Sequence, residues 1–191
     1  MKGRMSLKKF LYLLLAAIAI ISGSCSGQDV RRKIMRMQSK PIVIRADKMI
    51  CLSKNDADYR KKPLKWVSFH DTITCKPCQM SHISDWNHIM ETKGVGCCFV
   101  LSAKPCEVGK YVEAYQNTCY NTKACVYLDT AGFFVHDNPR VPQEALFQEF
   151  LMDEKNKVLL VGNPVRNGSV HELFIRILNE KEIDGLYNTK E

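Results

Sequence analysis

The sequence has no internal repeat, no low-complexity segment and no apolar run long enough to cross a bilayer. Its longest apolar run, residues 10–21, has twelve residues, whereas a membrane-spanning helix needs about 20. We therefore expect neither a repeat architecture nor a spanning helix. With 191 residues, the chain can form one domain of ordinary size with short appendages.

The short apolar run has the surroundings of a secretory signal peptide. Four basic residues within positions 2–9 precede it, and small residues follow at 22–24, which is the layout of such a peptide. Cys25 comes next, in the stretch IISGSCSG. This stretch resembles the lipobox of bacterial lipoproteins, in which a cysteine after small residues is lipidated. We expect loss of residues 1–24 and a lipid on Cys25; the alternative is ordinary cleavage that releases a soluble protein.

The positive charge of the chain is concentrated in that leader. The whole sequence has 28 Lys and Arg against 20 Asp and Glu, a formal charge of +8. Residues 1–24 hold four of the basic residues and no acid, so the remainder has 28 − 4 = 24 basic against 20 acidic residues, or +4. Nucleic-acid binding asks for a clustered basic face. The basic run at 31–40 is interpreted as part of a solvated tether, and we expect no nucleic-acid partner.

Nine cysteines are present, which suits an exported protein because disulfides persist in oxidising compartments. With Cys25 lipidated, eight remain, an even number that full pairing requires. They are Cys51, Cys75, Cys78, Cys97, Cys98, Cys106, Cys119 and Cys125. No second Cys-x-x-Cys and no His-x3-His motif is found, and structural zinc needs four ligands at suitable spacing. We expect no metal and no cofactor.

The apolar pattern predicts strands and helices in the order β-α-β-α-β, a β-hairpin, and a last helix. The strands are expected near 64–69, 97–103 and 125–129, the hairpin within 144–164, and the helices at 78–91, 105–119 and 169–181. A further strand-like stretch begins at residue 41, before a charged connection at 54–63. We expect a tether and amino-terminal extension at 25–63, a folded domain at 64–181 and a tail at 182–191.

Cys75 and Cys78 lie at the expected junction between the first strand and its helix. At a helix amino terminus, unpaired N–H groups and the positive end of the helix dipole lower the pKa of a thiol. Cys75 is then the attacking thiolate, and Cys78 is placed to resolve the mixed disulfide. Lys76 adds a positive charge near that thiolate, and Pro77 restrains the loop. These residues predict a redox pair.

The sequence CKPC, between a strand and a helix in this order of elements, resembles the thioredoxin superfamily, and within it the exported, membrane-tethered TlpA-like thiol-disulfide oxidoreductases. The resemblance covers residues 64–181. It implies an α/β, thioredoxin-like three-layer fold, with a central mixed sheet and flanking helices. VYLDTAGFF and FLMDEKNKVLLVGNP are similar to that family's strand end and hairpin.

Several positions depart from the family pattern. Thr74 stands where the family usually has Trp, and Phe147 stands where it usually has a cis-Pro that shapes the substrate groove. Ser68 corresponds to a buried acid or amide that moves protons for the resolving cysteine. Asp71 or His70 could substitute for that group.

Two functions follow from these residues. The first is a cell-envelope thiol-disulfide oxidoreductase that acts on thiol- or disulfide-containing envelope proteins and is held in the membrane, facing the periplasm or the surface, by lipidated Cys25. The alternative is a non-catalytic, lipid-anchored binding or structural domain whose cysteines form disulfide bridges. The six cysteines other than Cys25, Cys75 and Cys78 allow fifteen pairings.

Overall fold

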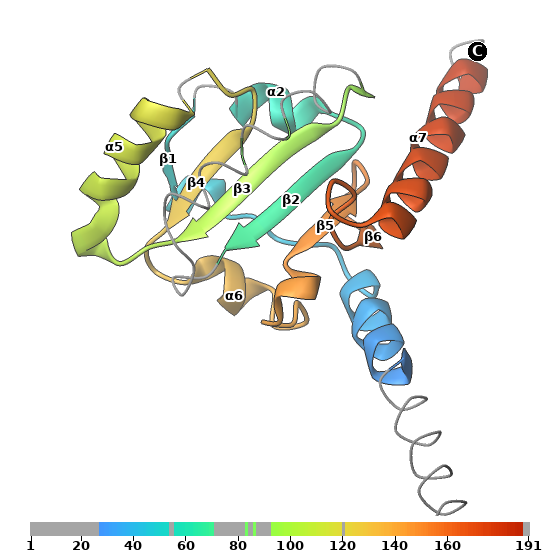
Figure 1. Cartoon of the computed structure of the whole chain (residues 1–191), viewed down its shortest axis with the longest axis horizontal. Helices are drawn as coiled ribbons and strands as arrows, with labels where there is room; N and C mark the ends of the chain where they lie inside the picture. The colour runs from blue at the N-terminus through green and yellow to red at the C-terminus, as the bar shows by residue number, and fades with distance from the viewer. Residues whose placement is uncertain are drawn as a thin grey trace, which may run out of the picture.

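The computed structural model of the chain describes residues 27–53, 56–70, 83, 86, 93–119 and 121–188. A six-stranded mixed sheet in the order β1-β4-β3-β2-β5-β6 forms its centre (Figure 1). The strands are β1 (Ile50–Cys51), β2 (Lys65–His70), β3 (Gly96–Ser102), β4 (Cys125–Asp129), β5 (Glu149–Met152) and β6 (Val158–Val161). β2, β3 and β4 run parallel, whereas β1, β5 and β6 each pair antiparallel with their neighbours.

The central strands are apolar on both faces. β2 is buried along its length except at His70, and β3 is buried up to Ser102. Parallel strands covered on both sides have near-continuous apolar runs rather than alternation, which explains the sequences KWVSFH and GCCFVLS. The sheet therefore has helices or loops on each face.

Helices lie around the sheet (Figure 1). They are α2 (Asp56–Lys61), α5 (Val108–Thr118), α6 (Phe133–Asp137), α7 (Gly168–Asn188) and a helix over residues 27–38. Three short 3-10 helices, η1 (Ala46–Lys48), η2 (Pro105–Glu107) and η3 (Ala145–Phe147), lie in connections. Each helix packs on one of the two faces of the sheet.

Two hydrophobic clusters lie between the sheet and the helices, one on each face of the sheet. The first cluster contains α5 and α7 residues with one face of the sheet, namely Leu64, Trp66, Ile83, Trp86, Phe99, Leu101, Tyr111, Tyr115, Leu151, Phe174 and Leu178 among others. The second cluster contains residues from the helix over 27–38, α2, α6 and η3 with the other face, namely Met37, Tyr59, Val67, Phe69, Cys98, Cys125, Phe134, Phe147 and Phe150 among others. The expected three-layer α/β architecture is confirmed.

The described elements match most of the sequence-based expectations. Strands at 96–102 and 125–129, the hairpin strands β5 and β6, and helices α5 and α7 lie where the apolar pattern predicted them. The strand-like stretch from residue 41 is different, since the only strand there is the two-residue β1 at Ile50–Cys51. Residues 27–38, expected within a tether, are helical, and Met37 is fully buried in the second cluster.

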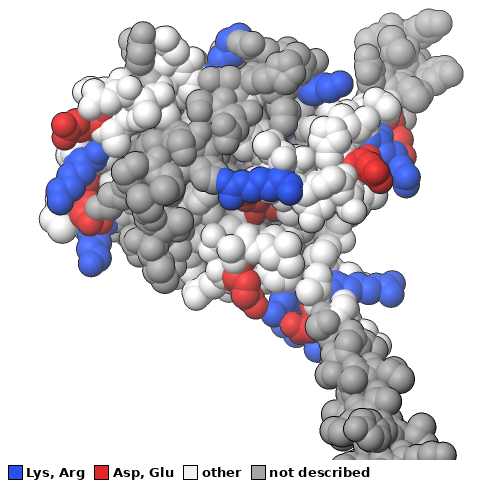
Figure 2. Space-filling view, in the orientation of Figure 1, with Lys and Arg blue, Asp and Glu red and all other residues white. Residues whose placement is uncertain are grey.

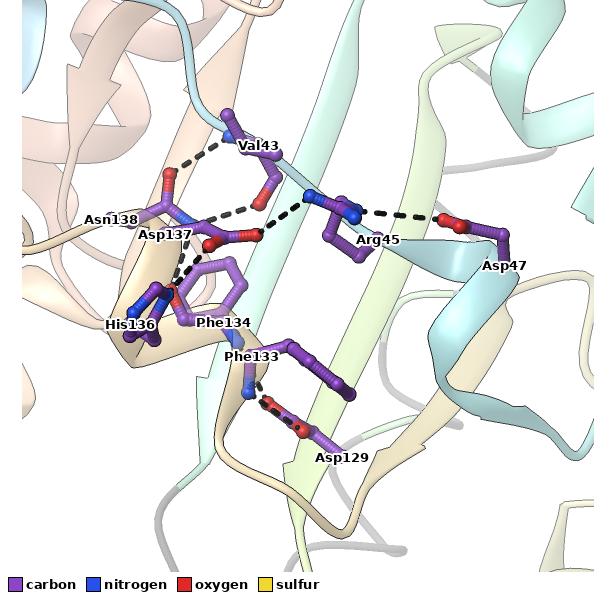
Figure 3. Close-up of polar contacts among 9 residues, drawn as sticks. All are labelled: Val43, Arg45, Asp47, Asp129, Phe133, Phe134, His136, Asp137 and Asn138. Atoms are coloured by element: carbon purple, nitrogen blue, oxygen red, sulfur yellow. Dashed lines mark hydrogen bonds and ion pairs between the residues drawn. The ribbon is translucent and has the colours of Figure 1, made fainter.

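α6 begins directly after Gly132, and the carboxylate of Asp129 holds its first turn (Figure 3). Its Oδ1 accepts hydrogen bonds from the backbone N–H of Phe133 at 3.0 Å and of Ala131 at 3.3 Å. Its Oδ2 accepts one from the N–H of Phe134 at 2.7 Å. Gly132, with φ of 72°, permits the left-handed turn before the helix. One carboxylate thus satisfies the first N–H groups of the helix.

The amino-terminal segment is fastened to α6 by Asn138, which is buried (Figure 3). Its Oδ1 accepts from the N–H of Val43 at 2.8 Å, and its Nδ2 donates to the carbonyl oxygens of Val43 and Phe134, each at 2.8 Å. Arg45 adds an ion pair with Asp137 at 3.5 Å. Residues 42–45 are therefore part of the folded domain.

Charges of both signs lie beside one another on the face drawn in Figure 2. Within the chain, Lys33 pairs with Asp29 at 2.8 Å and with Glu144 at 2.6 Å. These ion pairs offset part of the positive charge of residues 31–40. In the part of the chain that the structure describes, no helix has the length and apolar character needed to cross a membrane.

Candidate active site

The residues predicted to carry the chemistry, Cys75 and Cys78 with Lys76, Pro77 and Asp71, lie outside the described residues, as does Cys25. The structure does describe both ends of the chain segment that contains the cysteine pair. His70, the last residue of β2, precedes it, and Ile83 follows it. These two ends define where the segment leaves the sheet and where it returns.

β2 lies in the middle of the sheet, between β3 and β5. Side chains two residues apart on a strand share a face, so Ser68 and His70 project to the same side. Their Oγ and Nε2 atoms are 2.8 Å apart. The His70 ring stacks on Phe99 of β3 with ring centroids 6.4 Å apart. The carboxyl end of β2 therefore presents two polar, hydrogen-bonded groups on the face of the first cluster.

The chain returns to that same face at Ile83 and Trp86, which are both buried in the first cluster. Trp86 stacks on Trp66 of β2 with ring centroids 4.5 Å apart and an interplanar angle of 23°. Phe174 of α7 meets Trp66 edge-on at 6.2 Å. Because Trp66 shares a face with Ser68 and His70, both ends of the cysteine-bearing segment are held on one side of the sheet.

Phe147, which the sequence resemblance aligned with a cis-Pro, ends the 3-10 helix η3. Its N–H donates to the carbonyl of Glu144 at 2.9 Å, and its ring is buried in the second cluster. The next residue, Gln148, accepts a hydrogen bond from the N–H of Phe69 at 2.8 Å. No cis peptide bond occurs among the described residues. Phe147 is thus a core residue beside β2, on the face opposite Ser68.

The six described cysteines divide between the two faces and the surface. Cys97 and Cys119 belong to the first cluster, Cys98 and Cys125 belong to the second, and Cys51 and Cys106 are exposed. Adjacent Cys97 and Cys98 on β3 point to opposite faces of the sheet, and both are buried. No disulfide joins any two of these six cysteines. A bridge between Cys119 and Cys125 is disfavoured because they lie in clusters on opposite faces.

The buried thiols are poor nucleophiles. Burial raises the pKa of Cys97 and of Cys119. Burial also raises the pKa of Cys98, as does its neighbour Cys125, the residue opposite it in the pairing of β3 with β4. A raised pKa keeps a thiol protonated, and the thiolate is the reactive form. These three cysteines are therefore structural.

Sequence analysis missed one polar residue near the end of β2. Glu149 begins β5 and is the register partner of Ser68. Burial raises the pKa of its carboxyl group, while the charge of Arg166 and a hydrogen bond with Asn163 lower it. The only sequence signal was an acidic residue at the start of an otherwise apolar strand, EFLM. Within the described residues, no three His, Cys, Asp or Glu side chains lie together in a way that could hold a metal ion.

No protein-family model and no curated protein matches the sequence. Among solved structures, the chain is similar to a putative thiol:disulfide interchange protein DsbE from Chlorobium tepidum, with a TM-score of 0.50 and 14% identity over 74% of this chain and 97% of that one. It is also similar to an uncharacterized thioredoxin-like protein from Porphyromonas gingivalis, with a TM-score of 0.43 and 21% identity over 63% and 76% of the two chains. A third structure is the thioredoxin domain of a thiol-disulfide oxidoreductase from Bacteroides vulgatus, with a TM-score of 0.45 and 11% identity over 62% and 81%.

The first similarity, together with the mixed sheet and its two covering layers, shows that the chain has a thioredoxin-like fold.

Proposed function

We propose that this chain is a thiol-disulfide oxidoreductase of the cell envelope, with Cys75 as the attacking thiol and Cys78 as the resolving thiol. One observation carries the proposal. In a thioredoxin-like fold, the Cys-x-x-Cys sequence lies between the carboxyl end of β2 and the buried pair Ile83 and Trp86, which return to the same face. The described cysteines that are buried are unsuited to the reaction, and the two exposed ones, Cys51 and Cys106, do not belong to a Cys-x-x-Cys sequence.

The reaction is a two-step exchange. The Cys75 thiolate attacks one sulfur of a client disulfide, so that a Cys75–client bond forms and the other client sulfur leaves as a thiolate. Cys78 then loses its proton and attacks the Cys75 sulfur, which forms the Cys75–Cys78 disulfide and releases the second client thiolate. The client gains two electrons and two protons, and the oxidised pair is recycled by another dithiol protein. The reverse sequence oxidises a client.

The proposal also includes where the protein lies in the cell envelope. Residues 1–24 act as a signal peptide, and Cys25 carries the lipid that holds the protein on the membrane, facing the periplasm or the surface. The folded part begins close to that anchor, because residues 27–38 are helical and Met37 is buried in the second cluster. The clients are then thiol- or disulfide-containing envelope proteins near the membrane surface.

A second candidate function is a non-catalytic, lipid-anchored thioredoxin-like domain that binds a partner. Phe147 favours this candidate, because a buried aromatic ring stands where the family's substrate groove has its cis-Pro. The two candidates differ in what Cys78 does.

Expression of a Cys78→Ser variant separates them. An oxidoreductase accumulates mixed disulfides with envelope proteins, which are visible on non-reducing gels and absent from the Cys75→Ser/Cys78→Ser double variant. A binding domain gives the same gel pattern for both variants. The control is Cys106→Ser in the Cys78→Ser background, since Cys106 is exposed and lies outside the Cys-x-x-Cys sequence, and its loss should leave the adducts unchanged.

A further inference from the structure

A cavity of about 510 Å³ lies between the helix over residues 27–38 and the segment at 139–142 that follows α6. It is lined by three cationic side chains and two prolines, namely Lys33, Arg36, Arg140, Pro139 and Pro142. No carboxylate is among these lining residues. The helix packs into the second cluster, so the cavity lies on the side of the sheet opposite Ser68 and His70.

The helix over residues 27–38 buries one side and keeps its cations at the surface. Val30, Ile34 and Met37, spaced four and three residues apart, pack into the second cluster. The basic residues of the helix are exposed or half-buried. Residues 27–40 hold five Lys and Arg against one Asp, which gives a charge of 5 − 1 = +4. Packing of the apolar side therefore fixes a basic surface beside the cavity.

Lys33 holds this helix against the 3-10 helix η3. Its Nζ atom donates to Glu144 at 2.6 Å, pairs with Asp29 at 2.8 Å and lies 5.6 Å from the centre of the Phe147 ring. In Figure 1 the helix, coloured blue, accordingly lies beside the orange segment that contains η3. Because two carboxylates already pair with Lys33, the positive charge available to a ligand of the cavity is mainly that of Arg36 and Arg140.

Arg140 has a donor without an acceptor. Its Nε atom is shielded from solvent and has no hydrogen-bond partner among the described residues. Buried polar side-chain atoms in folded proteins are nearly always hydrogen-bonded, so an exception calls for an explanation. A guanidinium group presents its N–H donors in a rigid fork that matches two oxygens of one phosphate. The cavity beside Arg140, with Arg36 as a second cation, has the charge to attract such a group.

Two large apolar side chains are exposed on the elements that border the cavity. Met35 on the helix is 60% exposed, and Leu146 on η3 is 55% exposed. Basic residues beside exposed apolar side chains are typical of a surface that lies in the interface of a membrane. This combination favours the phosphate of a lipid over a phosphate in solution.

The position of the cavity along the chain also favours a lipid. The two residues from Cys25 to the start of the helix span at most about 7 Å. From residue 27 to Arg36 the helix rises about 14 Å. The cavity therefore lies within about 20 Å of the proposed anchor, close enough to reach the headgroup layer when the helix lies along the membrane.

We propose that this cavity binds the phosphate of an anionic phospholipid headgroup, with the guanidinium groups of Arg140 and Arg36 as donors. The inference rests on the lipid anchor of the proposed function and is independent of the cysteine pair. A headgroup that carries a cation, such as choline, is disfavoured by the like charges around the cavity. The docked domain turns the face of Ser68 and His70 away from the membrane, toward clients.

The test is lipid binding by the full chain in detergent, measured by native mass spectrometry. The probes are phosphatidylglycerol and phosphatidylcholine with identical acyl chains. We expect phosphatidylglycerol to bind at least about 10-fold more tightly, and Arg140→Lys to remove most of this preference, because lysine keeps the charge but loses the fork. The control Lys110→Gln removes a positive charge from an exposed residue of α5, on the other face of the sheet, and should match the wild type.

The outcomes are distinguishable. Equal binding of the two lipids by the wild type overturns the inference, and so does Arg140→Lys that retains the full preference, because charge alone then attracts the lipid. Glycerol 3-phosphate that binds as tightly as phosphatidylglycerol overturns the assignment to a lipid. The mass of the Cys25 peptide tests the anchor separately. A peptide without lipid overturns that part of the proposed function, whatever the lipid titration shows.

A second measurement asks which face of the protein meets the membrane. Trp66 and Trp86 are buried, so an indole introduced by Met35→Trp reports its own surroundings. The full chain is placed in vesicles of phosphatidylglycerol with brominated acyl chains, which quench indoles that enter the interface. We expect Met35→Trp to lose more fluorescence than the wild type, and Leu173→Trp, at an exposed position of α7, to lose no more than the wild type. Equal quenching at the two positions overturns the inference.

Discussion

Trp66 and Trp86 stack with their ring centroids 4.5 Å apart, and they are the two tryptophans of the chain. Trp66 belongs to β2, whereas Trp86 lies beyond the segment that carries Cys75 and Cys78. Their contact therefore holds the chain at residue 86 against the sheet. It also gives the two ends of the candidate site a common support in the first cluster.

Replacing Trp86 should weaken the whole domain. Trp86→Ala removes the ring that covers Trp66, and truncation of a buried tryptophan costs about 3–5 kcal/mol. Urea unfolding followed by circular dichroism measures this loss. The matched control is Leu173→Ala on α7, since Leu173 is 44% exposed and its removal should change the free energy of unfolding by less than about 0.5 kcal/mol. Equal effects of the two substitutions would contradict the packing described for Trp86.

Asp129 should stabilise the fold through α6. Asp129→Ala leaves three backbone N–H groups, those of Ala131, Phe133 and Phe134, without their carboxylate acceptor. Loss of a buried cap of this kind costs about 2 kcal/mol. Thermal unfolding should show the decrease. Asp47→Ala is the control, because Asp47 is exposed and has only a 3.8 Å ion pair with Arg45. A melting temperature unchanged by Asp129→Ala would refute this role.

Glu149 should make stability depend on pH in a defined direction. Burial raises the pKa of its carboxyl group above the ordinary value of 4.5. The folded state therefore binds this proton more tightly than the unfolded state does. The associated stabilisation is present below pH 4.5 and is lost as the pH rises through the folded-state pKa. Glu149→Gln removes this dependence.

The measurement is urea unfolding of wild type and Glu149→Gln at pH 4 and at pH 7. We expect the variant to gain stability relative to wild type between pH 4 and pH 7, because the wild type loses the stabilisation that comes with the protonated carboxyl group. A constant difference between the two proteins from pH 4 to pH 7 would show that the Glu149 carboxyl group titrates alike in both states.

Alkylation of the native, reduced protein should separate the described cysteines into two groups. Cys51 and Cys106 are exposed and should react with iodoacetamide, whereas Cys97 and Cys98 are buried with raised pKa values and should stay unlabelled. We expect labelling rates at pH 7.5 to differ at least about 100-fold, because reaction of a buried thiol requires the thiolate and an opened structure. Peptide mapping by mass spectrometry gives the rates, and unfolding in urea should abolish the difference. Fast labelling of Cys98 in the folded protein would disprove its burial.

Much of the architecture was predictable because its signals are local. The strands at 96–102 and 125–129 are apolar runs, and α5 and α7 bury aromatic or apolar side chains at helical spacing, such as Tyr111 and Tyr115. The hairpin has a polar turn between two apolar strands. These features depend on hydrophobic periodicity within a short stretch, so the local sequence is enough to predict them.

The parts that the sequence did not predict depend on contacts between distant segments. α6 has only five residues and exists because Asp129 accepts its first N–H groups. The helix over 27–38 is anchored by Met37, whose burial depends on partners far along the chain. The position of Glu149 opposite Ser68 follows only from the register of β5 against β2. Register between strands so far apart has no local signature.

The reactivity of Cys75 tests the central claim most directly. The rate of its alkylation by iodoacetamide in the reduced protein is measured from pH 4 to pH 10, with Cys106 in the same molecule as the internal reference. A thiol poised for disulfide exchange reacts as the thiolate, with a midpoint at about pH 7 or lower. We predict such a midpoint for Cys75, at least one unit below that of Cys106. A Cys75 midpoint at about pH 8.5, the value of an ordinary cysteine, would contradict the oxidoreductase function.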